Sequence, residues 1–123
     1  MGLLVRAHGR IVHSAYVLID NKTLRVLGLD RSSALLANAS TVHHYRGRGC
    51  QTRSVATRIA MSMEAGFDQV VAETALDNEH SQRALLSAGL RSVGTVRLVL
   101  LLSVLVVRTE HPRGRAALWD VCF

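Results

Sequence analysis

Apolar and polar positions follow each other at short intervals over the first third of the chain, which is typical of β-strands separated by turns. Residues 3–6 predict a strand that runs into a turn, and residues 11–20 predict a second strand that ends before the turn residue Asn21. Residues 23–29 are interpreted as a third extended segment. The first part of the chain is therefore expected to contribute mainly strands.

Residues 34–42 fit two interpretations, because the alanines and leucines of this segment also favour a helix. The residues that follow favour a strand that ends near Val42.

From Cys50 onward the apolar spacing changes to that of a helix. One face of this predicted helix carries Val55, Ala56, Ile59, Ala60 and Met63. Gly66 stands where a helix C-cap is expected.

The remaining segments complete an alternating pattern. Residues 68–74 predict a strand, residues 79–88 a helix that stops at Gly89, and residues 93–108 a further strand. Residues 109–123 show neither a clear period nor a cap, and no element is assigned to them. The order of strands, helix, strand, helix and strand predicts an α/β fold with a crossover connection around the first helix.

The basic character of the chain raises the question of a nucleic-acid partner. The net charge is +6, but Lys22 is the only lysine, the arginines are spread along the sequence and only 4% of residues are aromatic. Nucleic-acid recognition favours clustered basic residues and stacking aromatics, so we expect no nucleic-acid partner. Small anions rich in phosphate remain suitable ligands.

The patterns of cysteine, histidine and hydropathy argue against a disulfide-rich, metal-binding, secreted or membrane-spanning protein. Cys50 and Cys122 are too few and too far apart for a disulfide framework, and the six histidines lack the paired spacing of a metal site. No secretory signal is visible at the start. The apolar run at residues 98–107 is shorter than the ~20 residues of a membrane helix and predicts a buried strand. A cytoplasmic protein of one domain, without metal or membrane partner, is expected.

A turn rich in glycine and arginine, residues 46–52, lies between the predicted strand and the first long helix. The first turn of a helix has N–H groups without partners and a dipole that favours anions. Gly47 and Gly49 allow close approach of an anion, and Arg46 and Arg48 can donate charge-assisted hydrogen bonds to phosphate oxygens. The turn is suited to a pyrophosphate, although a plain turn with solvated arginines has the same composition.

Two other phosphate-binding motifs are rich in glycine like this turn. The chain contains no P-loop string. A dinucleotide fingerprint begins correctly at Gly47 and Gly49 but has Thr52 in place of its third glycine, and Glu73 could be the acidic ribose partner. A nicotinamide dinucleotide site is therefore an alternative, although more strands precede the turn than is usual for that fingerprint.

Residues 41–52 resemble motif A of the GNAT superfamily of N-acetyltransferases, Arg/Gln-x-x-Gly-x-Gly/Ala. Arg46 and Gly49 match the motif, and Gln51 replaces its last small residue, which we interpret as a subfamily variant. Residues 78–90 resemble motif B, in which Asn78, Ser81 and Gly89 match and Leu90 replaces the usual phenylalanine. The resemblance covers about residues 10–99.

This resemblance implies a mixed central sheet with flanking helices and transfer of an acetyl group from acetyl-CoA to an amine. It implies that the strand before the turn pairs with the pantetheine arm, that the turn and helix start bind the pyrophosphate, and that motif B contacts the arm from the other side. The implied cofactor-binding residues are Ala39, Ser40, Thr41, Val42, Arg46, Gly47, Arg48, Gly49, Cys50, Gln51, Thr52, Asn78 and Ser81.

The catalytic groups are less well defined. Many family members place a tyrosine acid in motif B, and the matching position here is Leu85, which cannot donate a proton. Glu73, at a predicted strand end, is the candidate base, with an ordinary surface carboxylate as the alternative. His43 and His44 are interpreted mainly as exposed loop residues.

We therefore expect residues 1–108 to form a partial GNAT-like acetyl-CoA-binding domain and residues 109–123 a C-terminal tail. Members of the superfamily usually begin with a strand and two helices, so the domain is expected to be incomplete at its N-terminus. The sheet edge left open would favour a homodimer. The acceptor is an unidentified small-molecule or protein amine, and the alternative function is a catalytically inactive CoA-binding or interaction module.

Overall fold

A computed structural model describes the backbone of residues 1–101, 104–110 and 116–122 and the side chains of residues 1–95. The elements in chain order are β1 (Gly2–Ala7), β2 (Arg10–Ile19), α1 (Lys22–Val26), β3 (Ser33–Thr41), the 3-10 turn η1 (His43–Tyr45), α2 (Cys50–Glu64), β4 (Gln69–Ala75), α3 (Glu79–Ser87), β5 (Arg91–Leu101), β6 (Val104–Glu110) and β7 (Ala116–Cys122).

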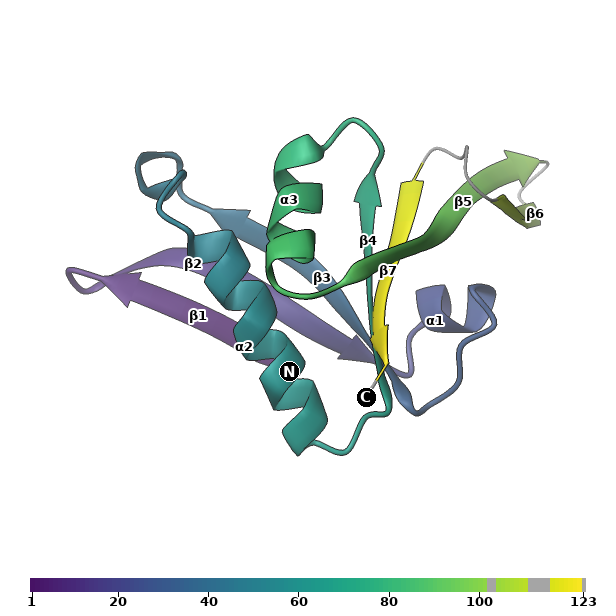
Figure 1. Cartoon of the computed structure of the whole chain (residues 1–123), viewed down its shortest axis with the longest axis horizontal. Helices are drawn as coiled ribbons and strands as arrows, with labels where there is room; N and C mark the ends of the chain where they lie inside the picture. Colours follow the sequence, from purple (N-terminus) through teal and green to yellow (C-terminus); the bar gives the residue numbers. More distant parts are fainter. Residues whose placement is uncertain (102–103, 111–115, 123) are drawn as a thin grey trace.

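All described strands belong to one mixed sheet in the order β1-β2-β3-β4-β7-β5-β6. Only β3 and β4 are parallel, and α2 connects them as the crossover helix. The other neighbouring pairs are antiparallel. The predicted α/β fold with a mixed sheet and flanking helices is therefore confirmed (Figure 1).

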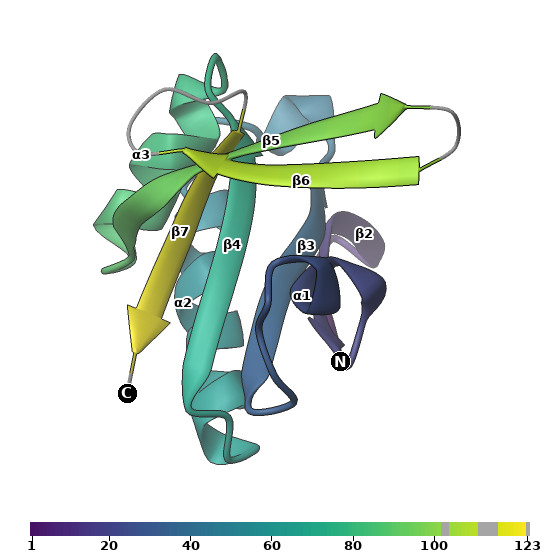
Figure 2. The ribbon, with the colours of Figure 1, turned by 90° about the vertical axis from the view of Figure 1, so that its right-hand side faces the viewer.

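Two apolar clusters lie on opposite faces of the sheet. On one face, Val55 of α2 and Leu85 of α3 pack against Leu36 and Ala72 of the central strands. On the other face, Leu24 of α1 packs against side chains of β3 and β4. Figure 2 shows α2 and α3 on one side of the sheet and α1 on the other. The central strands are covered on both faces, which explains their nearly continuous apolar sequence.

The prediction of a third extended segment at residues 23–29 is wrong, because this segment contains the short helix α1. Asn21, interpreted as a turn residue, is its N-cap, and Asn21 Oδ1 accepts a hydrogen bond from the Leu24 amide at 2.9 Å. Leu24 is 1% exposed, so one buried side chain holds this helix against the sheet.

Helix α2 is confirmed, but its buried face differs from the prediction. Val55 is buried and Ile59 is partly buried, whereas Ala56, Ala60 and Met63 are exposed. The buried positions of the helix are Ser54, Val55, Arg58 and Ser62. The helix thus presents a polar stripe to the sheet, which hydrophobic spacing alone does not reveal.

The C-terminal part differs most from expectation. The single strand predicted for residues 93–108 is wrong, since β5 and β6 are two antiparallel strands paired from Thr95↔Glu110 to Leu101↔Val104. Within residues 109–123, where no element was assigned, β7 is inserted between β4 and β5. The side chains of residues 98–107, expected to be buried, lie outside the described side chains. Over the described part of the chain, none of the helices has the length and apolarity needed to cross a bilayer.

Candidate functional site

The two parallel strands separate halfway along their length. Their pairing runs from Ser33↔Gln69 to Leu36↔Ala72. Beyond this point β3 continues as a partner of β2, with a register shift between Ser14 and Tyr16. The end of β4 pairs with β7. Asn38, at the shift, has a left-handed backbone with φ 49°. The strand ends therefore leave an opening in the middle of the sheet.

A groove leads from this opening to the start of α2. The inner cavity, of about 320 Å³, is lined by residues that include Leu36, Ala72 and Thr74. The outer cavity, of about 660 Å³, is lined by Ser40, Thr41, Arg46, Gly47 and His80, among others. The two cavities adjoin, because both are lined by Ala39, Gln51, Asn78 and Ser81.

The outer end of the groove meets the first turn of α2. Gly47 and Gly49 have φ of 73° and 74°, a left-handed conformation that favours glycine. Gly49 is the N-cap, no side chain caps the helix, and its first turn holds no acidic residue. The first helical bond runs from Arg53 N to Gly49 O at 3.1 Å, so the amides of residues 50–52 are the ones that helix geometry leaves without intrahelical acceptors.

The two arginines of the turn are placed differently. Arg46 lines the outer cavity, and its Nε donates to the carbonyl oxygen of Thr41 at 3.3 Å. The Arg48 guanidinium instead lies over the ring of Tyr45, with 5.1 Å between Cζ and the ring centroid. Arg46 is thus directed to the groove, while Arg48 packs against the turn itself.

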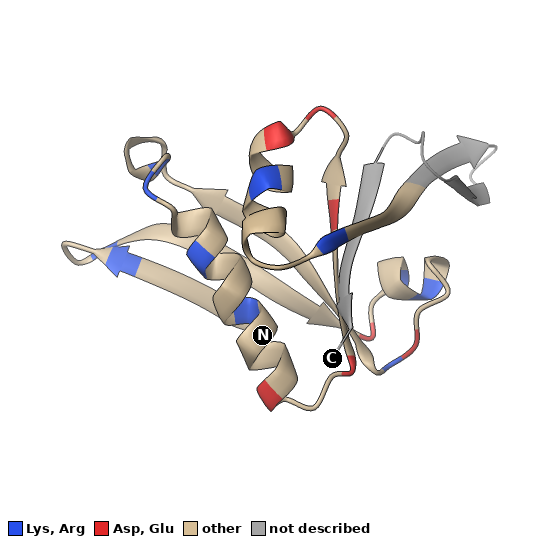
Figure 3. Ribbon diagram, viewed as in Figure 1, with Lys and Arg blue, Asp and Glu red and all other residues tan. Residues whose placement is uncertain are grey.

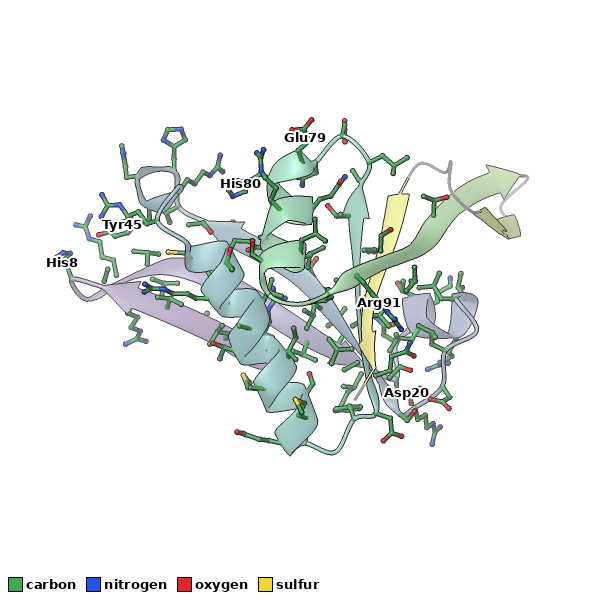
Figure 4. All side chains as sticks on the ribbon, in the orientation of Figure 1. His8, Asp20, Tyr45, Glu79, His80 and Arg91 are labelled. Carbon is green, nitrogen blue, oxygen red and sulfur yellow. The ribbon has the colours of Figure 1, made fainter. Side chains whose placement is uncertain are left out.

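The opposite wall comes from the start of α3. Asn78 is the N-cap, and its Oδ1 accepts a hydrogen bond from the Ser81 amide at 3.1 Å. This bond fixes the Asn78 side chain at the groove. His80 also lines the outer cavity, which the sequence analysis did not predict (Figure 4). Its only sequence signal is its position between the two predicted residues Asn78 and Ser81.

The predicted cofactor residues come together, although their roles stay predictions. Those that line the outer cavity are Ala39, Ser40, Thr41, Arg46, Gly47, Gln51, Asn78 and Ser81. Gly49, Cys50 and Thr52 border a small adjoining cavity of about 50 Å³ at the helix start. Val42 and Arg48 line none of these three cavities.

The candidate catalytic residue Glu73 lines the inner cavity from β4, and its side chain is exposed. Leu85 lines the same cavity and is 3% exposed. The exposed rings of His43 and His44 lie 5.8 Å apart and border neither main cavity. Of these groups, only Glu73 can exchange a proton inside the groove.

Two buried polar residues near the groove were missed. Arg58 of α2 lines the inner cavity and is 2% exposed, and burial lowers its pKa to about 10. His13 of β2 is 1% exposed, and burial together with the neighbouring Arg58 charge lowers its pKa. The signal for Arg58 in the sequence is the four-residue spacing of Ser54, Arg58 and Ser62.

Charge is distributed over several elements of the molecule. Figure 3 shows basic residues at the turn between β1 and β2, in the loop before α2, on α2 and on α1.

In the part of the chain with described side chains, no group of three His, Cys, Asp or Glu residues is arranged to hold a metal ion.

Comparison with known proteins identifies the architecture. No protein-family model and no curated protein matches the sequence. Solved structures do match, among them a GCN5-related N-acetyltransferase from Kribbella flavida (18% identity, TM-score 0.73, 99% of this chain and 67% of that chain). The chain has the GNAT fold.

Other solved structures match with similar TM-scores. The ribosomal-protein-S18-alanine N-acetyltransferase from Escherichia coli is 15% identical, with a TM-score of 0.70 over 99% of this chain and 68% of that chain. A Bacillus subtilis acetyltransferase, solved in complex with CoA, is 10% identical, with a TM-score of 0.71 over 99% of this chain and 76% of that chain. At these identities the likeness establishes the fold.

Proposed function

We propose that this chain binds acetyl-CoA and transfers the acetyl group to an amine, with the acetyl-CoA-binding part inside residues 1–108. The observation that carries the proposal is the α2 N-terminus, which no side chain caps and which opens onto a groove between separated parallel strands. The GNAT fold and the CoA complex of one structural neighbour support it.

The start of α2 is suited to the diphosphate of CoA. The amides of Cys50, Gln51 and Thr52 supply donors where the helix dipole favours negative charge. Arg46 adds a cation at the outer cavity, and no acidic side chain in the first helical turn opposes an anion. Main-chain donors do not depend on side-chain identity, so Gln51 in place of a small residue is compatible with this role.

The outer cavity is suited to the pantetheine arm. Ala39, Ser40 and Thr41 line it from β3, beyond the last pair of β3 with β4. Asn78 and Ser81 line it from α3. We propose that an extended, amide-containing chain lies between these two walls and adds hydrogen bonds at the separated strand edge. The reacting thioester is then placed at the inner cavity.

In the proposed reaction the amine nitrogen bonds to the acyl carbon, the carbon–sulfur bond breaks and CoA leaves as its thiol. Glu73 is the proposed base that accepts the ammonium proton, directly or through water. Leu85 cannot protonate the departing sulfur. The sulfur therefore takes its proton from solvent or takes the proton that was removed from the amine. We expect slow turnover for this reason.

The second candidate function is a CoA-binding module without catalysis. The observation that favours it is Leu85, an aliphatic side chain where a proton donor is expected. For either function we propose acetyl-CoA as partner, a small-molecule or protein amine as acceptor and a cytoplasmic location. We further propose a homodimer through β1, which is an edge strand of the sheet.

Two measurements test the proposal on the intact chain. Calorimetric titration with CoA and acetyl-CoA is expected to show binding, and titration with NAD is expected to show none. Thiol release from acetyl-CoA is then followed with a panel of amines. Binding of CoA together with thiol release supports the enzyme, and binding without thiol release supports the module. Binding of NAD but not of CoA contradicts both.

A further inference from the structure

Arg58 is a buried cation whose hydrogen bonds go to main-chain carbonyls. Its Nε donates to Ser54 O at 3.3 Å, and its Nη1 donates to Tyr16 O at 3.1 Å and Ala37 O at 3.5 Å. Within residues 1–95 the structure gives Nη2 no acceptor, although a guanidinium carries five N–H donors. The side chain thus retains donors for another group.

Among the side chains that the structure describes, no carboxylate is paired with this cation. The ion pairs within residues 1–95 join Arg25 and Arg31 to Asp20, and Arg83 to Glu79. The buried neighbour His13 has a lowered pKa and adds no negative charge. Its Nε2 atom is buried without a hydrogen-bond partner. Burying a charge is costly unless the charge is paired, so the lack of an anionic partner among the described side chains requires an explanation.

The position of Arg58 supplies that explanation. Arg58 lines the inner cavity, and its contact with Ala37 is at the point where β3 leaves β4. The cavity, of about 320 Å³, is within the usual range for ligand sites and is far larger than an acetyl group. A ligand that enters the opening between the strands therefore approaches a guanidinium with unused donors.

We propose that Arg58 binds a carboxylate of the ligand that occupies the inner cavity, so that one of the two reactants is a carboxylic acid. This inference rests on the proposed function and names a substrate class for it. A guanidinium recognises a carboxylate through charge-assisted hydrogen bonds, and it does so most strongly away from water.

Two sources of the carboxylate fit the cavity. The first is an acyl donor whose acyl group ends in a carboxylate, such as the succinyl group of succinyl-CoA. The second is an acceptor that carries a carboxylate near its amine, such as an amino acid. Among the described residues that line the cavity, the acidic one is Glu73 on β4, whereas Arg58 is on α2. An amino acid would place its ammonium group toward Glu73 and its carboxylate toward Arg58.

Calorimetry on the unmodified protein tests the donor. If the donor carries the carboxylate, succinyl-CoA binds at least about tenfold more tightly than acetyl-CoA, the effect of a charge-assisted hydrogen bond. To test the acceptor, N-acetyl amino acids and their amides are titrated into the CoA-loaded protein. A preference of the same size for the acids supports the second source.

A variant assigns the preference to Arg58. Arg58→Gln is expected to remove the preference while affinity for CoA itself changes less than about threefold, and Arg53→Gln, an exposed position on the same helix, retains it. If Arg58→Gln does not fold, the inference is decided by two affinity ratios measured on the unmodified protein: succinyl-CoA against acetyl-CoA, and the N-acetyl amino acids against their amides. CoA binding with no preference in either titration overturns this inference alone, whereas failure of CoA to bind overturns the proposed function together with it.

Discussion

The Nδ1 atom of His13 lies 2.7 Å from the hydroxyl oxygen of Thr41, which is its direct neighbour in the pairing of β2 with β3. This contact fixes the end of β3 that borders the outer cavity. It also holds the imidazole in a site where burial and the nearby Arg58 charge lower its pKa.

His13 should therefore make stability depend on pH. His13 in the unfolded chain takes up a proton near the ordinary pKa of 6.5, whereas in the folded chain burial and the Arg58 charge lower this pKa, so that the proton binds only at lower pH. Because the unfolded state then binds more protons, the free energy of unfolding is expected to fall as the pH drops from about 6.5 toward the lowered pKa. Urea denaturation between pH 7.5 and 5 should show a smaller loss of unfolding free energy in His13→Gln than in the unmodified protein. Equal losses would show that His13 is not the source of the pH dependence.

Gly49→Ala is expected to weaken CoA binding by about tenfold or more. A non-glycine residue in this left-handed conformation costs about 1–2 kcal/mol and displaces the first turn of α2 from its anion-binding geometry. Gly66→Ala is the matched control, because Gly66 has φ 83° and, as at Gly49, an added Cβ meets no atom within 4 Å. Both variants should lose similar stability in thermal melts, and only Gly49→Ala should lose affinity in calorimetry. Equal affinity in the two variants would exclude the helix start as the diphosphate site.

Glu73→Gln tests the proposed base. The amide cannot accept the ammonium proton, so the rate of acetyl transfer is expected to fall by about 100-fold or more while CoA affinity is retained. Glu64→Gln, at the exposed end of α2, serves as the control for a lost surface carboxylate. Thiol release under saturating acetyl-CoA measures the rate. A rate within a few fold of that of the unmodified protein would show that Glu73 is an ordinary surface carboxylate and not the base.

Leu85→Ala tests the packing of α3 on the sheet. Leu85 is 3% exposed within the main apolar cluster, so truncation is expected to cost about 2–5 kcal/mol of unfolding free energy. The adjacent Leu86 is 55% exposed, and Leu86→Ala should change stability by less than about 0.5 kcal/mol. Denaturant titration of the pair provides the comparison. Similar losses in both variants would show that α3 packs differently.

Local signals in the sequence were sufficient for the elements that carry the proposed site. Helix α2 follows from its four-residue spacing and from Gly66 after its end, and α3 follows from Asn78 and Gly89. The glycine turn between β3 and α2 is visible for the same reason, since it is defined by adjacent residues.

Features that depend on distant partners could not be predicted in this way. The short helix α1 is fixed by burial of Leu24 against two central strands, and β7 is fixed by neighbours far away in the sequence. The polar face of α2 escaped detection because Arg58 donates hydrogen bonds to carbonyl oxygens of β2 and β3, which are distant in the sequence. Hydrophobic spacing contains no information on such long-range hydrogen bonds.

The insertion of β7 between β4 and β5 has a consequence for biosynthesis. When β4 leaves the ribosome, its parallel neighbour β3 already exists, but the strand that pairs with its other side is made only after α3, β5 and β6. During that interval the nascent chain exposes an apolar strand with one unpaired edge, a form prone to intermolecular pairing. We expect efficient production of this protein to depend on chaperones that shield β4 until translation reaches residue 122.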